Sequence, residues 1–154
     1  MGAFDAASAA KIISDLIPKS LDNIIRARRD KYALRLTMFA DFEGMPHLVE
    51  AMGGIQRNVK GELAEWQIIC FEDIKKQSED RLFLIGYKNG NVFMTSPIKS
   101  VDFKNGMVLT ENSLYRLIGA EARGEPDTEL LIHICTTFNA WGVGQHLGVP
   151  QFFY

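Results

Sequence analysis

The sequence predicts an α+β fold in which N-terminal helices and a C-terminal helix pack against an antiparallel β-meander of four to five strands. Two Lys-Asn-Gly tripeptides, at 88–90 and 104–106, each separate apolar runs that alternate with a period of two. Apolar residues recur at helical spacing before residue 40 and again after residue 129. The length of 154 residues suits one domain. Its expected parts are a mainly helical part (1–60), a sheet (61–118), a helix (125–141) and an aromatic tail (142–154).

The N-terminal part is expected to hold two helices. Residues 5–17 form the first, because Pro18 disfavours the α conformation of the residue before it. Ser20 is a typical N-cap for a longer helix that runs to about residue 40. Its apolar stripe consists of Leu21, Ile24, Ile25, Tyr32, Leu36 and Phe39. Residues 32–38 also alternate with a period of two, so a strand there is the alternative.

Two consecutive hairpins are the strongest local prediction. Residues 82–87 and 91–95 flank Asn89-Gly90, and residues 98–103 and 107–111 flank Asn105-Gly106. An Asn-Gly pair between apolar strands favours a type I′ turn, whose twist matches that of the strands. The run 66–71 and the tripeptide 115–117 are expected to add further strands to the meander.

Both faces of the first hairpin are apolar, and this bears on function. Phe83, Ile85 and Tyr87 alternate along the strand with Leu82 and Leu84. A strand that is apolar on both faces is covered on both, either by helices of the same chain or by a partner.

The final helix, residues 125–141, is expected to carry Pro126 in its first turn, together with acidic side chains. Its apolar face consists of Leu130, Leu131, Ile134, Cys135, Phe138 and Trp141. The chain then ends in three aromatic residues, each able to bury about 150–250 Å². They are expected to dock on the protein itself or on another chain. The candidate interface residues are therefore Phe93, Trp141, Phe152, Phe153 and Tyr154.

Composition disfavours several classes of protein. With 17 basic and 19 acidic residues, the chain lacks the basic excess typical of nucleic-acid binders. The basic cluster from Arg26 to Lys31 is kept as an alternative nucleic-acid surface. No apolar run approaches the ~20 residues needed to cross a bilayer, and no secretion signal is recognised. The two cysteines, Cys70 and Cys135, are expected to be reduced core thiols of a cytoplasmic protein.

No motif for a reaction or a metal stands out. His47, His133 and His146 have no partner at the spacing of a metal site, and neither a metal nor a cofactor is expected. No serine lies in a nucleophile-elbow pattern. The glycines from Gly142 to Gly148 lack the strand–loop–helix context of a phosphate-binding loop. The sequence therefore favours a binding protein over an enzyme.

A second interpretation is a pocket between helix and sheet that binds an anionic or nucleotide-like small molecule, or an unrecognised enzyme with such a pocket. The candidate contacts are Arg28, Tyr87, Tyr115 and His146. Arg28 is notable because it falls within the apolar stripe of the expected N-terminal helix. Either its stem lies along the edge of the core, or its guanidinium pairs with a buried carboxylate or a ligand anion.

Part of the predicted sheet resembles a known group of proteins. The residues are Thr95-Ser96-Pro97-Ile98, Val101, Val108-Leu109-Thr110, Asn112-Ser113 and Tyr115-Arg116-Leu117. They resemble a β-meander of small accessory proteins of proteobacterial phages and mobile elements, over less than a fifth of the chain. The resemblance implies a protein that binds and inhibits a host defence factor, with no catalytic residues. We therefore expect a non-enzymatic protein that acts by protein–protein contact, as an inhibitor, immunity-type protein or adaptor, or that self-associates.

Overall fold

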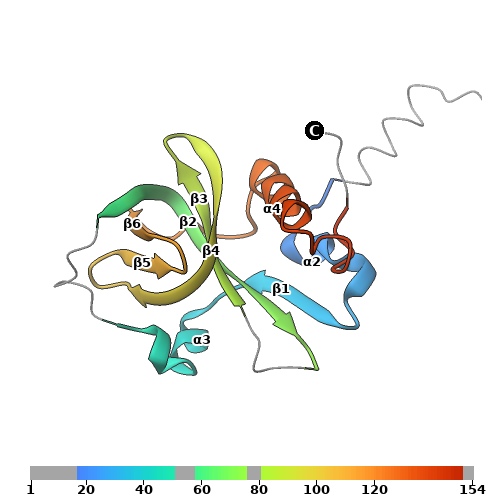
Figure 1. Ribbon diagram of the computed structural model, residues 1–154, viewed down its shortest axis with the longest axis horizontal. Coiled ribbons are helices and arrows are strands. Elements are labelled where there is room, and N and C mark those ends of the chain that lie inside the picture. The colour runs from blue at the N-terminus through green and yellow to red at the C-terminus, as the bar shows by residue number, and fades with distance from the viewer. Residues whose placement is uncertain (1–16, 51–57, 76–80, 151–154) are drawn as a thin grey trace, which may run out of the picture.

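The computed structural model describes residues 17–50, 58–75 and 81–150, which form an α+β fold as predicted (Figure 1). The first expected helix, residues 5–17, lies almost entirely outside these residues. The elements in chain order are α2 (Leu21–Ile24), the 3-10 helix η1 (Arg26–Arg28), β1 (Tyr32–Leu36), α3 (Phe39–Glu43), the 3-10 helix η2 (Pro46–Leu48), β2 (Val59–Asp73), β3 (Arg81–Lys88), β4 (Asn91–Asp102), β5 (Met107–Thr110), β6 (Leu114–Ile118) and α4 (Thr128–Ala140).

The strands form one sheet that closes on itself, so the prediction of a simple meander is wrong. Consecutive strands from β1 to β6 pair antiparallel, but β6 also pairs with β2 in parallel, at Leu63↔Leu117 and Ala64↔Ile118. Strands β2 to β6 therefore form a closed barrel, and β1 adds one more strand beside β2. The physical reason is the length of β2, whose 15 residues reach β1, β3 and β6.

Irregularities in β2 and β4 allow the sheet to close. The register of β2 with β3 shifts between Ala64 and Gln67, and Glu65 between them has a φ of 48°. Gly86 of β3 packs against this bulge so closely that an added Cβ would lie 2.8 Å from the carbonyl oxygen of Ala64. The register of β4 shifts against both β3 and β5. Because a bulge bends and twists its strand, these shifts allow the sheet to curl into a barrel.

Only the first hairpin has the predicted turn. Asn89 and Gly90 have φ values of 54° and 79°, as a type I′ turn requires. In the second hairpin only Gly106 has a positive φ, and four residues connect Asp102 to Met107. The Asn105 amide N–H donates to the Asp102 carboxylate at 3.1 Å, and this side-chain contact stabilises a longer turn. The type I′ prediction is wrong there.

The prediction of a long helix from Ser20 to about residue 40 is also wrong. The Ser20 hydroxyl does cap α2, accepting from the Asn23 amide N–H at 3.1 Å, but α2 ends at Ile24. Residues 32–36 form strand β1, so the alternative prediction of a strand there is confirmed; β1 pairs along its whole length with β2. This pairing buries Tyr32 and Leu34, which are two positions apart and therefore on one face of the strand. The tertiary pairing outweighs the local preference that the helical spacing indicates. As a result Arg28 lies exposed in η1 and not within a helical apolar stripe.

Two apolar cores lie on opposite faces of the sheet. The helix-side core lies between the sheet and helices α2 and α4, and the barrel core lies within the closed strands. Phe83 and Ile85 belong to the helix-side core, whereas Leu82 and Leu84 belong to the barrel core. The hairpin that is apolar on both faces is thus covered on both by its own chain. Cys135 and Cys70 are buried reduced cysteines, one in each core, so the sheet separates them.

The C-terminal helix is confirmed, but it runs from Thr128 to Ala140, so that Pro126 lies before its N-cap and not in its first turn. The carboxylate of Asp127 caps α4 by accepting from the Leu130 amide N–H at 2.9 Å. Five of the six residues on the predicted apolar face are buried in the helix-side core, namely Leu130, Leu131, Ile134, Cys135 and Phe138. The sixth, Trp141, follows the helix and is 45% exposed. Among the helices described, none is long and apolar enough to cross a membrane.

Candidate functional site: a cleft between α4 and the barrel

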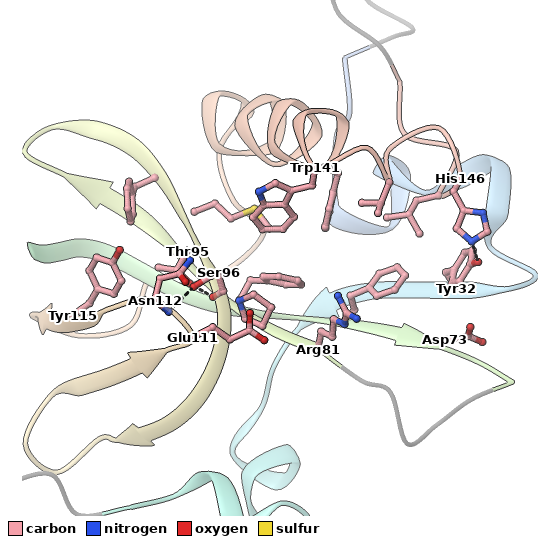
Figure 2. A pocket seen from close by; sticks show the side chains of 18 residues that line it. Tyr32, Asp73, Arg81, Thr95, Ser96, Glu111, Asn112, Tyr115, Trp141 and His146 are labelled. Carbon is pink, nitrogen blue, oxygen red and sulfur yellow. Dashed lines mark hydrogen bonds between the residues drawn. The ribbon is translucent and has the colours of Figure 1, made fainter. Parts of the chain in front are cut away.

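A cleft of about 820 Å³ lies between the C-terminal end of α4 and strands β3 and β4. Its aromatic lining comprises Tyr32, Phe71, Phe83, Phe93, Tyr115, Phe138 and Trp141. Its polar lining comprises Asp73, Arg81, Thr95, Ser96, Glu111, Asn112 and His146. Figure 2 shows Trp141 on one wall, Ser96 and Glu111 on the opposite wall, and Tyr32 with His146 at one end. The combination of aromatic surface and a few polar groups is typical of a binding site.

The wall of the cleft that contains Trp141 is an aromatic cluster centred on Phe138. The ring of Trp141 lies 6.0 Å from that of Phe138 and 5.6 Å from that of Phe83, measured between centroids. Phe83 and Phe138 are themselves in edge-to-face contact at 6.0 Å. Because these contacts hold the half-exposed Trp141 ring in place, it can receive an apolar group with little loss of conformational entropy.

One end of the cleft is closed by the segment that follows α4. His146 of this segment makes a hydrogen bond with the Tyr32 hydroxyl, with 2.5 Å between Oη and Nε2. Leu147 and Val149 are buried in the helix-side core, and the Asn139 side-chain amide donates to the Pro150 carbonyl oxygen at 3.2 Å. The described part of the predicted tail is therefore folded back onto the domain.

Arg81 supplies a positive charge to the cleft and is not among the ligand contacts predicted from the sequence. It is the first residue of β3, and its exposed side chain forms no ion pair within the described parts of the chain. A signal was present in the sequence, because Arg81 shares the two-residue alternation of Phe83 and Ile85. A charged residue in that position lies at the end of the helix-covered face. Asp73 and Glu111 also line the cleft, so it carries both signs of charge.

The cleft brings together two of the four predicted ligand contacts. Tyr115 and His146 line it, whereas Arg28 and Tyr87 do not. Arg28 is exposed, and its Cγ packs beside Gly148. The Tyr87 hydroxyl donates to the Asp127 carboxylate, which ties β3 to the start of α4. Burial and this hydrogen bond raise the pKa of Tyr87 well above its ordinary value.

Only some of the predicted interface residues line the cleft. Phe93 and Trp141 line the cleft, and the aromatic residues 152–154 lie outside the described residues.

The basic cluster of the alternative nucleic-acid surface lies in η1 and the turn after it. Arg29 pairs with Asp22 at 2.7 Å, and Arg26 donates to the Asn23 carbonyl oxygen at 3.2 Å. Local partners therefore hold two of its cations.

Two titratable side chains of α4 are stabilised in their neutral forms. Burial raises the pKa of the Cys135 thiol to about 12, and burial also lowers the pKa of His133. Neither residue lines the cleft. Within residues 17–50, 58–75 and 81–150, no group of three histidine, cysteine, aspartate or glutamate side chains is placed to hold a metal ion. The arrangement in the cleft can hold an apolar group beside a charged or hydrogen-bonding one.

No protein-family model matches the chain, and no curated protein or solved structure does. The resemblance of residues 95–117 to accessory proteins of phages and mobile elements therefore stays a prediction.

Proposed function

We propose that the protein is a non-enzymatic binding protein that holds a partner protein in the cleft between α4 and the barrel. The observation that carries the proposal is Trp141, which lies half-exposed in a cleft that also holds the Arg81 cation. A few residues carry most of the binding energy at protein interfaces, and tryptophan, tyrosine and arginine are enriched among them. A matching partner would place an apolar side chain on Trp141 and a carboxylate against Arg81.

The class of partner rests on the sequence resemblance. Accessory proteins of mobile elements act on host factors, and an inhibitor of this kind works by covering a functional surface of its target. We therefore propose a host protein as the partner and inhibition as the outcome. A second copy of the same chain is the competing occupant, and the experiment below distinguishes the two.

The test is native mass spectrometry of the full chain after gentle purification from a lysate of its source cells. Wild type is compared with Trp141→Ala and Arg81→Glu, and with Ile118→Ala as a matched control. Ile118 is 40% exposed on β6 and does not line the cleft. A polypeptide retained by wild type and Ile118→Ala, but lost from both cleft variants, supports the proposal. Retention by all four proteins contradicts it, and a doubled mass identifies self-association.

A small-molecule binding protein is the second candidate, and the size of the cleft favours it. Its volume of about 820 Å³ falls within the roughly 300–1,000 Å³ of ligand pockets. An anionic ligand would pair with Arg81 and pack its apolar part on the aromatic wall. In the same experiment, a retained mass of a few hundred daltons that Arg81→Glu abolishes would favour this function over the first.

A further inference from the structure

A second hollow, of about 190 Å³, lies where α3 meets the barrel. Three aromatic side chains line it, namely Phe42 of α3, Trp66 of β2 and Phe103 of the turn after β4. Met38 and Ile68 complete its apolar wall, Thr37 adds a hydroxyl that donates to the Ile68 carbonyl oxygen, and Glu121 contributes the one carboxylate among the lining residues described. None of these residues lines the cleft beside α4, so the two sites are separate. We call this hollow the aromatic cage.

The rings of the aromatic cage are held in two orientations. Trp66 and Phe103 are nearly parallel, at an interplanar angle of 19°, with centroids 6.1 Å apart. Phe42 stands almost perpendicular to Phe103, at 84° and 5.0 Å. The Trp66 indole N–H donates to the Gly119 carbonyl oxygen at 3.1 Å, and the Ala122 amide N–H donates to the Trp66 carbonyl oxygen at 3.0 Å. These bonds fix the indole and position the segment that carries Glu121.

The carboxylate of Glu121 has no partner within the described parts of the chain. No ion pair or hydrogen bond joins it to another residue there. Burial raises the pKa of this carboxyl, in keeping with a charge that lacks compensation. Arg35, on the neighbouring strand β1, is already engaged by Asp41 at 2.8 Å and by Glu72 at 2.6 Å. The cage therefore presents a negative charge together with three aromatic rings.

We propose that the aromatic cage binds an alkylated ammonium group, such as the head of a choline-type molecule or a methylated lysine side chain. The faces of aromatic rings attract cations, and tryptophan does so most strongly. The volume of about 190 Å³ equals that of roughly six water molecules, which suits a nitrogen with its methyl groups. Methyl groups also match the apolar wall, whereas a bare ammonium is strongly hydrated and costs more to bury.

Met38 lies at the rim of the cage and is 71% exposed. Its flexible thioether can pack against the alkyl part of an entering ligand. The site therefore combines attraction for charge with contact surface for methyl groups. It depends on neither the partner nor the ligand of the cleft beside α4.

The test uses fluorescence of the full chain carrying Trp141→Phe. The protein contains two tryptophans, so Trp66 in the cage is then the only one. The protein is titrated with choline chloride, with sodium chloride at matched ionic strength, and with 3,3-dimethyl-1-butanol, the uncharged isostere of choline. A saturable change with choline alone supports the proposal. An equal response to the isostere shows an apolar pocket without cation selectivity, and contradicts it.

Variants then assign the signal to the cage. Phe103→Leu is expected to weaken choline binding roughly 3- to 30-fold, the range of a lost cation–π contact. Glu121→Gln is expected to weaken it roughly fivefold. Leu117→Ala is the matched control, because Leu117 packs against the barrel core but does not line the cage. If Phe103→Leu fails to fold, the comparison of choline with its uncharged isostere still tests whether the cage selects a cation.

Peptides identify the source of the cation. A peptide containing trimethyl-lysine is compared with the same peptide containing lysine, in the Trp141→Phe protein. Tighter binding of the methylated peptide than of choline assigns the site to a partner's side chain, and the reverse order assigns it to a free cation. No saturable response to choline or to either peptide overturns the proposal.

Discussion

Tyr32 and His146, 114 positions apart in sequence, are joined by a hydrogen bond of 2.5 Å between Oη and Nε2. The bond connects β1, which lies outside the barrel, to the segment that follows α4. The Tyr32 ring also packs on Phe71 of β2, with centroids 5.3 Å apart. One end of the cleft therefore depends on three parts of the chain that meet only in the folded protein.

Tyr32→Phe should loosen this end of the cleft. It removes the hydrogen bond to His146 and keeps the ring, so we expect a loss of about 1 kcal/mol in the free energy of unfolding. Urea unfolding measures it. Tyr115→Phe is the matched control, because no hydrogen bond of the Tyr115 hydroxyl is present among the described residues. Equal losses in the two variants would contradict the role of the Tyr32–His146 contact.

Asp41→Asn should destabilise the protein at neutral pH and not in acid. The Arg35 guanidinium beside it lowers the pKa of the Asp41 carboxyl below its ordinary value of 3.8. Its stabilising contribution is therefore present above pH 3.8 and is lost as the pH falls through the lowered pKa. We expect a loss of about 1 kcal/mol at pH 7 that fades toward pH 2.

Urea unfolding at the two pH values measures this difference. Asp22→Asn is the control, because the pair of Asp22 with Arg29 is more than half exposed on both sides. That variant should lose less than about 0.5 kcal/mol. A loss from Asp41→Asn that is the same at both pH values would show that the ion pair is not its cause.

Gly86→Ala should be more costly than Gly90→Ala. A Cβ on Gly86 would lie 2.8 Å from the Ala64 carbonyl oxygen and 3.1 Å from the Trp66 Cα, so β2 and β3 would have to separate. We expect about 2–3 kcal/mol for this crowding. Gly90 has open space around it and only a positive φ of 79°, which should cost about 1 kcal/mol. Thermal unfolding followed by circular dichroism compares the two variants, and the opposite ranking would exclude this close approach.

Glu121→Gln should stabilise the protein at pH 7 in the absence of any ligand. Burial raises the folded-state pKa of Glu121 above the ordinary value of 4.5. The folded protein therefore binds more protons than the unfolded chain between these values, and its stability falls as the pH rises through that window. Removing the charge removes the penalty, so the melting temperature should rise at pH 7 and change little at pH 4. Glu62→Gln, at an exposed carboxylate on β2, is the control. A lower melting temperature at pH 7 would show that Glu121 has a stabilising partner.

Local sequence determined the elements whose residues interact with near neighbours. Asn89-Gly90 encoded its turn, because both residues tolerate a positive φ. The capping carboxylate of Asp127 and the apolar spacing from Leu130 to Phe138 encoded α4. The two-sided apolar alternation around Phe83 likewise encoded a strand that is covered on both faces.

Tertiary structure decided the rest. The residues from Tyr32 to Leu36 became a strand because β2 offers them a partner for every residue, although their spacing also suits a helix. Closure of the barrel depends on the parallel pairing of β2 with β6, whose paired residues are more than fifty positions apart in the sequence. The cleft and the aromatic cage each combine side chains from several such elements. Hydrogen bonding and packing between distant strands set these positions, and those energies depend on three-dimensional neighbours that a linear pattern does not contain.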